Sequence, residues 1–86
     1  MTTQKANTVD TVEKIQKIIA NSLGIPPDRI HAETKAEDVA EWDSLHHFMI
    51  VMEIEETFGF KFSLQELPEL DSVESIVRAI QRRVPA

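Results

Sequence analysis

Asp43, Ser44, His46 and His47 bring an acid, a hydroxyl and two imidazoles together within five positions. These residue types can form the nucleophile, the base and the orienting acid of a hydrolase. The segment that begins at Ser44 has the apolar spacing of a helix, and neighbouring side chains on a helix point in different directions. Three near-adjacent residues therefore cannot form such a relay. The chain also lacks the G-x-S-x-G motif of a nucleophile elbow, so a hydrolase is not predicted.

The histidines do not predict a metal site. A zinc site on one helix needs two ligands four positions apart, as in H-E-x-x-H. The residues four positions after His46 and His47 are Ile50 and Val51, which are not ligands. The chain has no Cys, which excludes disulfides and thiolate metal sites. We expect His46 and His47 to face solvent or a partner.

Ser44 has a second chemical option, because it stands where a helix is expected to begin. Unpaired backbone N–H groups and the positive end of the helix dipole suit a phosphate on that hydroxyl. The plainer alternative is an ordinary N-cap serine. Ser72 also follows an Asp and precedes an apolar residue, and we expect it to be a plain N-cap. The local sequence leaves both interpretations of Ser44 open.

Composition limits the classes of partner. The 86 residues carry 9 basic and 15 acidic side chains, for a net charge of -6. This balance argues against nucleic acid and favours partners with basic surfaces. A chain of this length forms one small domain, whose core hardly allows a deep catalytic pocket.

The N-terminal stretch is not expected to be a signal peptide. Residues 1–7 are polar and lack the apolar core of a signal peptide. No apolar run approaches the roughly 18 residues that a membrane helix needs. We therefore expect a flexible lead over 1–7, a single domain over 8–86, no membrane span, and a cytoplasmic monomer.

The first helix is expected to begin at Asp10, because Glu13 follows it at capping-box spacing, and to end at Gly24. The next connection, residues 25–43, is too long to cross a compact domain without anchors. The residues expected to hold it are Ile30 and Val39 as core anchors, Thr34 with Glu37 as the cap of a short turn, and Trp42 at its base.

The second helix is expected to run from Ser44 to Phe58 and to end at Gly59. Its predicted inward stripe comprises Leu45, Phe48, Val51, Ile54 and Phe58. The remaining face is unusually apolar, with Met49, Ile50 and Met52. Three acids near its C-terminal end, Glu53, Glu55 and Glu56, oppose the helix dipole. They indicate either a surface for a partner or a solvated face.

A last helix is expected to follow the Asp71-Ser72 cap, with a clean 3.6-residue apolar period. Between the second and last helices, residues 63–67 predict one short helical turn that Pro68 should end. Phe60 and Phe62 are expected to anchor this connection in the core. The predicted fold is all-α: a small four-helix bundle of three main helices and one short one, with a long loop between the first two.

Several of these segments together resemble the acyl carrier proteins. Asp43-Ser44-Leu45 opens a helix that closes with Glu55-Glu56-Thr57-Phe58-Gly59, and Leu70-Asp71-Ser72-Val73 follows at the family's spacing. The resemblance implies that Ser44 carries 4'-phosphopantetheine, which a phosphopantetheinyl transferase takes from coenzyme A. It implies that Asp43 helps the transferase recognise the site. It also implies a non-catalytic carrier of acyl thioesters, since the reactive thiol is on the arm.

The resemblance implies partners as well: acyl-activating, acyl-transferring or condensing enzymes with basic docking patches. The residues expected to contact them are Leu45, His46, Met49, Met52, Glu53 and Glu56. His46, His47 and Met49 stand where fatty-acid carriers often have acids, and the W-D-S-L form resembles carriers of specialised pathways. We expect fatty-acid-like or specialised lipid or polyketide-type biosynthesis. The alternatives are a stand-alone aminoacyl or peptidyl carrier and an unmodified helical adaptor.

Overall fold

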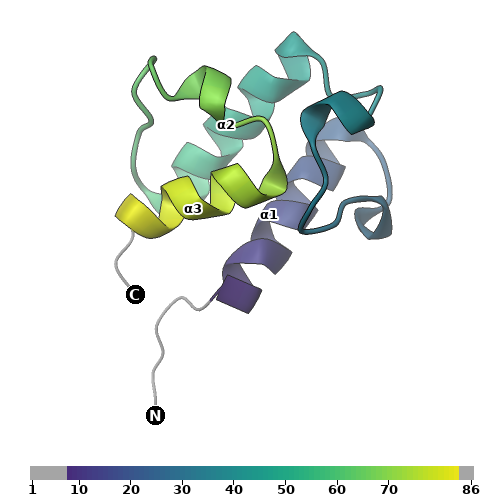
Figure 1. Cartoon of the computed structure of the whole chain (residues 1–86), viewed down its shortest axis with the longest axis horizontal. Helices are drawn as coiled ribbons and strands as arrows, with labels where there is room; N and C mark the ends of the chain where they lie inside the picture. The colour runs from purple at the N-terminus through teal and green to yellow at the C-terminus, as the bar shows by residue number, and fades with distance from the viewer. Residues whose placement is uncertain (1–7, 84–86) are drawn as a thin grey trace.

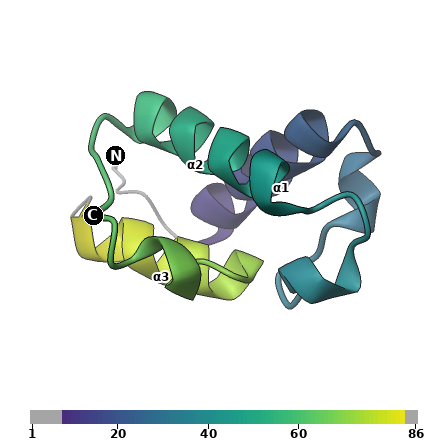
Figure 2. The same ribbon diagram turned by 90° about the horizontal axis from the view of Figure 1, so that it is seen from above.

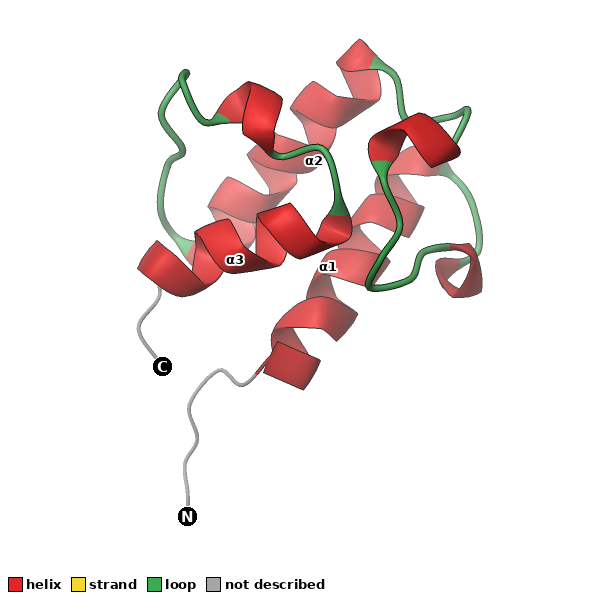
Figure 3. Cartoon of the chain, in the orientation of Figure 1, coloured by secondary structure: helices red, strands yellow, loops and turns green. Residues whose placement is uncertain are grey.

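The computed structural model describes residues 8–83, with side chains from Asp10 onward, and these residues form an all-helical bundle (Figures 1 and 3). No strand occurs in this part of the chain; a single bridge pairs Lys35 with Ser72. The predicted all-α bundle is confirmed. The elements in chain order are α1 (Thr8–Leu23), η1 (Pro27–Arg29), η2 (Ala36–Asp38), α2 (Ser44–Phe58), η3 (Leu67–Glu69) and α3 (Val73–Arg83), where η is a 3-10 helix.

Helix α1 contacts both α2 and α3. Figure 1 shows α3 in front of α1 and α2, and the view from above in Figure 2 places α3 on one side of that pair. The space between the helices is filled by branched aliphatic side chains, which pack densely and keep few rotamers. The largest fully buried side chains are those of Ile15, Ile19, Ile30, Ile50, Ile54, Val73, Ile76 and Ile80.

The connection from α1 to α2 is anchored where the sequence predicts. Ile30 and Val39 are both buried in the core. The predicted cap by Thr34 and Glu37 is wrong, because Thr34 Oγ1 instead accepts a hydrogen bond from the backbone N–H of His31 at 2.8 Å. The turn η2 does form, but without any side-chain cap. Backbone hydrogen bonds already order this segment, so it has no need of the cap.

Glycines end α1 and α2 as predicted. Gly24 and Gly59 have φ values of +70° and +76°, the left-handed conformation that glycine adopts without a Cβ clash. The start of α1 is less well predicted, since the helix begins at Thr8 and Asp10 lies in its first turn. An acidic side chain there still interacts favourably with the positive end of the helix dipole. The predicted lead, 1–7, and the end of the predicted domain, 84–86, lie outside the described residues.

The predicted inward stripe of α2 is partly wrong. Ile50, Val51 and Ile54 are buried, whereas the side chains of Leu45 and Phe48 are 65% and 56% exposed. Because α2 is apolar on most sides, more than one stripe fits the helical period, and the pattern cannot choose between them. The helix therefore packs the branched residues of one stripe and leaves the other on the surface.

The turn predicted at residues 63–67 forms, but Pro68 does not end it. A turn occupies residues 64–66, and η3 follows at Leu67–Glu69 with Pro68 inside it. Proline can begin a helical turn because its fixed φ suits the first helical positions and its missing N–H is not needed there. Pro68 thus opens the turn instead of ending it. The predicted anchor Phe62 is buried, and Phe60 packs edge-on against it with ring centroids 4.9 Å apart.

Candidate functional site

Ser44 is the first residue of α2, and its side chain is exposed. The N-cap is Asp43, whose Oδ1 accepts a hydrogen bond from the backbone N–H of His46 at 2.9 Å. Ser44 is one residue too late to fill that role. Its side chain makes no hydrogen bond with any residue that the structure describes. The interpretation of Ser44 as an ordinary N-cap is therefore wrong, and its hydroxyl is available for other chemistry.

The carboxylate of Asp43 is held next to this hydroxyl. The backbone N–H of His46 holds the pKa of Asp43 below its usual range, and the His46 ring adds to the effect. His46 Nδ1 lies 2.7 Å from Asp43 Oδ1. Asp43 is therefore ionised at neutral pH, so a negative charge and an exposed hydroxyl stand side by side at the start of α2.

Two further segments meet beside Ser44. Trp42 Nε1 donates a hydrogen bond to His47 Nδ1 at 3.0 Å, and His47 Nε2 lies 3.2 Å from the carbonyl oxygen of Leu67. The first contact joins α2 to the loop before it, and the second joins α2 to η3. Around these contacts lies an open hollow of about 460 Å³. Its lining residues are Ala36, Trp42, Asp43, Ser44, His47, Pro68 and Asp71.

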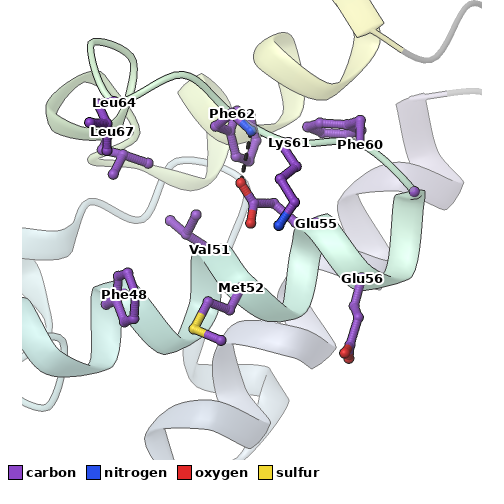
Figure 4. Close-up of a pocket in the computed structure, with 11 residues that line it drawn as sticks. Phe48, Val51, Met52, Glu55, Glu56, Phe60, Lys61, Phe62, Leu64 and Leu67 are labelled. Carbon is purple, nitrogen blue, oxygen red and sulfur yellow. Dashed lines mark hydrogen bonds between the residues drawn. The ribbon is translucent and has the colours of Figure 1, made fainter.

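A larger apolar groove lies on the outer side of α2. It has a volume of about 560 Å³ and runs between α2 and the connection after Gly59. Figure 4 shows Phe48 and Met52 of α2 on one wall and Leu64 and Leu67 of the connection on the other. Leu64 is 84% exposed, so the groove opens to solvent.

Two acidic side chains hold the connection that forms this groove. Glu55 Oε2 accepts a hydrogen bond from the backbone N–H of Phe62 at 2.8 Å, as Figure 4 shows. Glu66 pairs with Arg83 at the end of α3. The Arg83 guanidinium also lies 5.7 Å and 5.5 Å from the ring centroids of Phe60 and Phe62, where cation–π attraction adds to the contact. Glu55 is thus a structural residue rather than part of an open acidic face.

The structure brings most of the predicted contact residues to one surface. Met49, Met52, Glu53 and Glu56 line a shallow hollow on α2, and Leu45 is exposed. His46 instead turns to Asp43, as described above. The link from Trp42 through His47 to η3 was not predicted from the sequence. A buried Trp usually needs an acceptor for its indole N–H, and that need was the available signal.

The described part of the chain offers neither a metal cluster nor a membrane-spanning helix. Among those residues, no three His, Asp or Glu side chains are grouped so that they hold a metal ion. None of the helices in 8–83 has the length and hydropathy to cross a bilayer.

Comparison with known proteins places this geometry in a family. The sequence profile described as "Phosphopantetheine attachment site" matches residues 13–80, which include Ser44. The acyl carrier protein of Zymomonas mobilis is 40% identical over 67 residues, which cover 78% of this chain and 78% of that protein. That of Akkermansia muciniphila is 33% identical over 70 residues, covering 81% and 88%. That of Thermosynechococcus vestitus is 28% identical over 80 residues, covering 93% and 99%. The chain belongs to the acyl carrier proteins, and the cofactor of its domain is phosphopantetheine.

Proposed function

We propose that Ser44 carries the phosphopantetheine arm and that Asp43 helps the transferase to recognise it. The observation that supports this assignment most directly is the exposed hydroxyl of Ser44, which Asp43 leaves unused by taking the N-cap. A transferase can approach this oxygen without unfolding the helix. The attack would join Ser44 Oγ to the arm's phosphorus, release the hydroxyl proton, and expel the nucleotide part of coenzyme A.

The residues present fit a phosphodiester at this position. The first N–H groups of a helix have no intrahelical acceptor, and together with the dipole they favour an anion. The Asp43 carboxylate repels a phosphate but offers a ligand for a hard cation that a transferase supplies. When bound, the arm supplies a terminal thiol that holds acyl groups as thioesters. The protein's own task is to hold the phosphate end and leave the rest of the arm mobile.

The proposed partner-facing surface is the outer side of α2, with Leu45, Met49, Met52, Glu53 and Glu56. His46, whose ring pairs with Asp43, would contact partners from the start of the helix. The exposed apolar side chains of this surface can enter a partner's cleft, and methionines adapt their shape to different partners. Glu53 and Glu56 border this apolar area and suit basic groups on the partner. The enzymes that dock here would be the transferase and enzymes that load, transfer or condense acyl groups.

We place this carrier in a cytoplasmic pathway of fatty-acid-like or specialised lipid or polyketide-type biosynthesis. Peptidyl carriers usually have G-G-H-S or G-G-D-S at the attachment site, whereas this chain has Trp42-Asp43-Ser44-Leu45. An amino-acid cargo is therefore the second choice. Loading assays with acyl and aminoacyl donors on the arm-bearing protein would separate the two. A preference for amino acids would overturn the proposed cargo without affecting Ser44.

Intact-mass measurement tests the attachment site. The protein is incubated with coenzyme A and a phosphopantetheinyl transferase of broad specificity, and we expect the mass of one arm to be added. Ser44→Ala should abolish the addition completely, because it removes the only oxygen proposed to accept the arm. Ser72→Ala is the matched control and should be modified fully. An unmodified wild-type protein, under conditions that convert a known carrier, would favour the adaptor alternative.

A further inference from the structure

His47 occupies a special place in the first turn of α2. It follows Ser44 by three positions, so the two lie on the same side of the helix. Its half-buried ring bonds to two other segments of the chain: the loop before α2 through Trp42, and η3 through Leu67. Neither segment is the helix on which His47 itself stands. One imidazole thus joins three elements beside the proposed attachment site.

The two contacts together determine where the imidazole carries its proton. An indole N–H only donates, so Nδ1 of His47 must be unprotonated to accept from Trp42. A carbonyl oxygen only accepts, so Nε2 must carry the proton that is donated to Leu67. Only the neutral Nε2–H tautomer makes both hydrogen bonds. Any other protonation state loses at least one of them.

Trp42 connects this arrangement to the start of α2, and it lines the same hollow as Ser44. Trp42 is 6% exposed, and it directly precedes the N-cap Asp43. Its backbone N–H is bonded to the carbonyl oxygen of Val39 at 3.0 Å, and its indole N–H to His47. Trp42 is therefore held both at its backbone N–H and at its ring, and these two bonds fix the path of the chain into α2. A Trp42 ring without its acceptor would bury an unsatisfied N–H or turn outward, and Asp43 would move with it.

Two sets of bonds hold the far side of the hollow. Backbone bonds join the two connections that contribute Ala36 and Asp71 to its lining, from Ala36 N to Asp71 O at 2.8 Å and from Val73 N to Thr34 O at 3.0 Å. Those bonds do not involve α2. The bond from His47 to Leu67 links α2 to η3, whose Pro68 lines the hollow with Ser44.

We propose that His47, as its neutral Nε2–H tautomer, is a positioning residue for attachment of the arm at Ser44. It acts through Trp42 and Leu67 and does not touch the reacting oxygen. This proposal rests on the proposed function of Ser44. Loss of His47 leaves the hydroxyl in place but loosens the surface that a transferase binds around it. The expected effect is a rise in KM for the carrier of about tenfold, with little change in kcat.

The first measurement is spectroscopic and needs no transferase. The chain has one tryptophan, so the indole N–H gives a single signal in a nitrogen-15 spectrum. We expect that signal to be protected from exchange, and the His47 imidazole to show an unprotonated Nδ1 and a protonated Nε2. His47→Ala should expose the indole N–H to exchange. His31→Ala is the matched histidine control and should leave it unchanged, because the His31 side chain is exposed and outside the hollow.

The second measurement is the kinetics of arm transfer on four proteins: wild type, His47→Ala, Trp42→Phe and the double variant. If His47 acts through the indole N–H, the double variant should have a KM close to that of His47→Ala, since the shared bond is lost only once. His47→Asn places an amide oxygen near the position of Nδ1 and should restore part of the indole protection and part of the KM. Because His47→Asn and Trp42→Phe are milder changes, they keep the test decisive even if His47→Ala folds poorly.

Two results would overturn the proposal: a His47 ring protonated at Nδ1, or a wild-type KM in well-folded His47→Ala. Additive effects in the double variant would also contradict it, since they would show that His47 and Trp42 act separately. Failure of the proposed function looks different. In that case wild-type Ser44 takes no arm at all, while the indole and imidazole signals still report whether His47 holds Trp42.

Discussion

Two helices of this protein begin with nearly the same three residues, and the two starts do different things. Asp43-Ser44-Leu45 precedes and opens α2, and Asp71-Ser72-Val73 does the same for α3. In α2 the aspartate is the N-cap, and the serine is already the first helical residue. In α3 the serine precedes the first helical residue, Val73. The same triplet is thus used in two registers that differ by one residue.

The register decides whether the hydroxyl is consumed. Ser72 Oγ accepts a hydrogen bond from the backbone N–H of Ser75 at 3.0 Å, and Ser75 Oγ accepts one from the backbone N–H of Ser72 at 3.1 Å. This reciprocal pair is a capping box in which Ser75 takes the N3 place that Glu or Gln usually fills. The hydroxyl of Ser44 has no such role because Asp43 performs it.

Burial of the following residue separates the two starts further. Leu45 is 65% exposed, whereas Val73 is fully buried. The start of α3 is therefore closed against the core, and the start of α2 projects toward solvent. A modifiable serine needs both the unused hydroxyl and the open surroundings, which explains why one triplet is proposed to carry the arm and the other only caps a helix.

The largest expected effect comes from imposing the register of α2 on α3, which tests whether register alone makes a serine modifiable. The double substitution Ser72→Asp with Val73→Ser gives α3 an aspartate cap followed by a serine. We expect no second arm, because the position of Val73 faces the core. We also expect a loss of about 2–4 kcal/mol in the free energy of unfolding, since the change removes buried methyl groups and adds a buried hydroxyl.

Urea denaturation and intact mass after arm transfer measure the two outcomes. Ser72→Asp alone is the control: it keeps an acceptable cap and should cost much less stability. A second arm on the double variant would show that register alone makes a carrier site, and that burial plays no part.

Single alanine substitutions compare the two hydroxyls directly. Ser72→Ala removes the acceptor for the Ser75 N–H and should lower the free energy of unfolding by about 1 kcal/mol. Ser44→Ala removes an exposed side chain without a hydrogen bond and should change it by less than about 0.5 kcal/mol. Urea unfolding of the unmodified proteins measures both. Equal losses would mean that Ser44 also supports its helix, and the contrast would fail.

The C-terminal ends of α1 and α2 were predicted well from the sequence. Gly24 and Gly59 stop α1 and α2 because only a left-handed residue lets the chain turn there, and that requirement is local. The anchors Ile30 and Val39 were predictable for a related reason, since isolated apolar residues in a long polar loop have to be buried somewhere. Such inferences need no knowledge of what lies on the far side of the core.

The buried face of α2 was not predictable in the same way. Leu45 and Phe48 have helical spacing, as do Ile50 and Ile54, and only packing against α1 and the rest of the core decides between them. The surface that remains apolar is the one proposed here to meet partners. A helix that packs against the core on one side and presents apolar side chains to partners on another has little contrast between apolar and polar faces. Its buried face therefore cannot be predicted from the sequence pattern.

The candidate site was predictable in its residues but not in its geometry. Asp43 and Ser44 are both good N-cap residues, so local preference alone could not say which one caps α2. The hydrogen bond that the His46 N–H donates to Asp43 Oδ1 settles that question. The His47 link was out of reach because its partners, Trp42 and Leu67, become neighbours only after the chain has folded around the hollow.

The smallest expected effect concerns acid, to which the two caps should respond differently. The cap of α2 is a carboxylate whose pKa is lowered, mainly by the backbone N–H of His46, while the cap of α3 is a neutral hydroxyl. A group whose pKa is lower in the folded state stabilises that state above its unfolded pKa, about 4 for Asp, and loses the contribution as the pH falls through the folded value. As the pH falls through the lowered pKa of Asp43, the His46 N–H should therefore lose its charged acceptor while the Ser75 N–H keeps its own.

Backbone amide chemical shifts, followed from neutral pH down to about pH 2.5, measure this difference residue by residue. The His46 amide should titrate and the Ser75 amide should stay in place, until the whole domain unfolds. Asp43→Asn keeps a cap that cannot ionise, so its His46 amide should lose the step that coincides with the Asp43 carboxyl signal in the wild type. If both amides moved together with one midpoint in the wild type, the transition would be global unfolding, and the two helix starts would not be electrostatically distinct. A separate, earlier midpoint at His46 would instead show that the start of α2 depends on the charge beside Ser44.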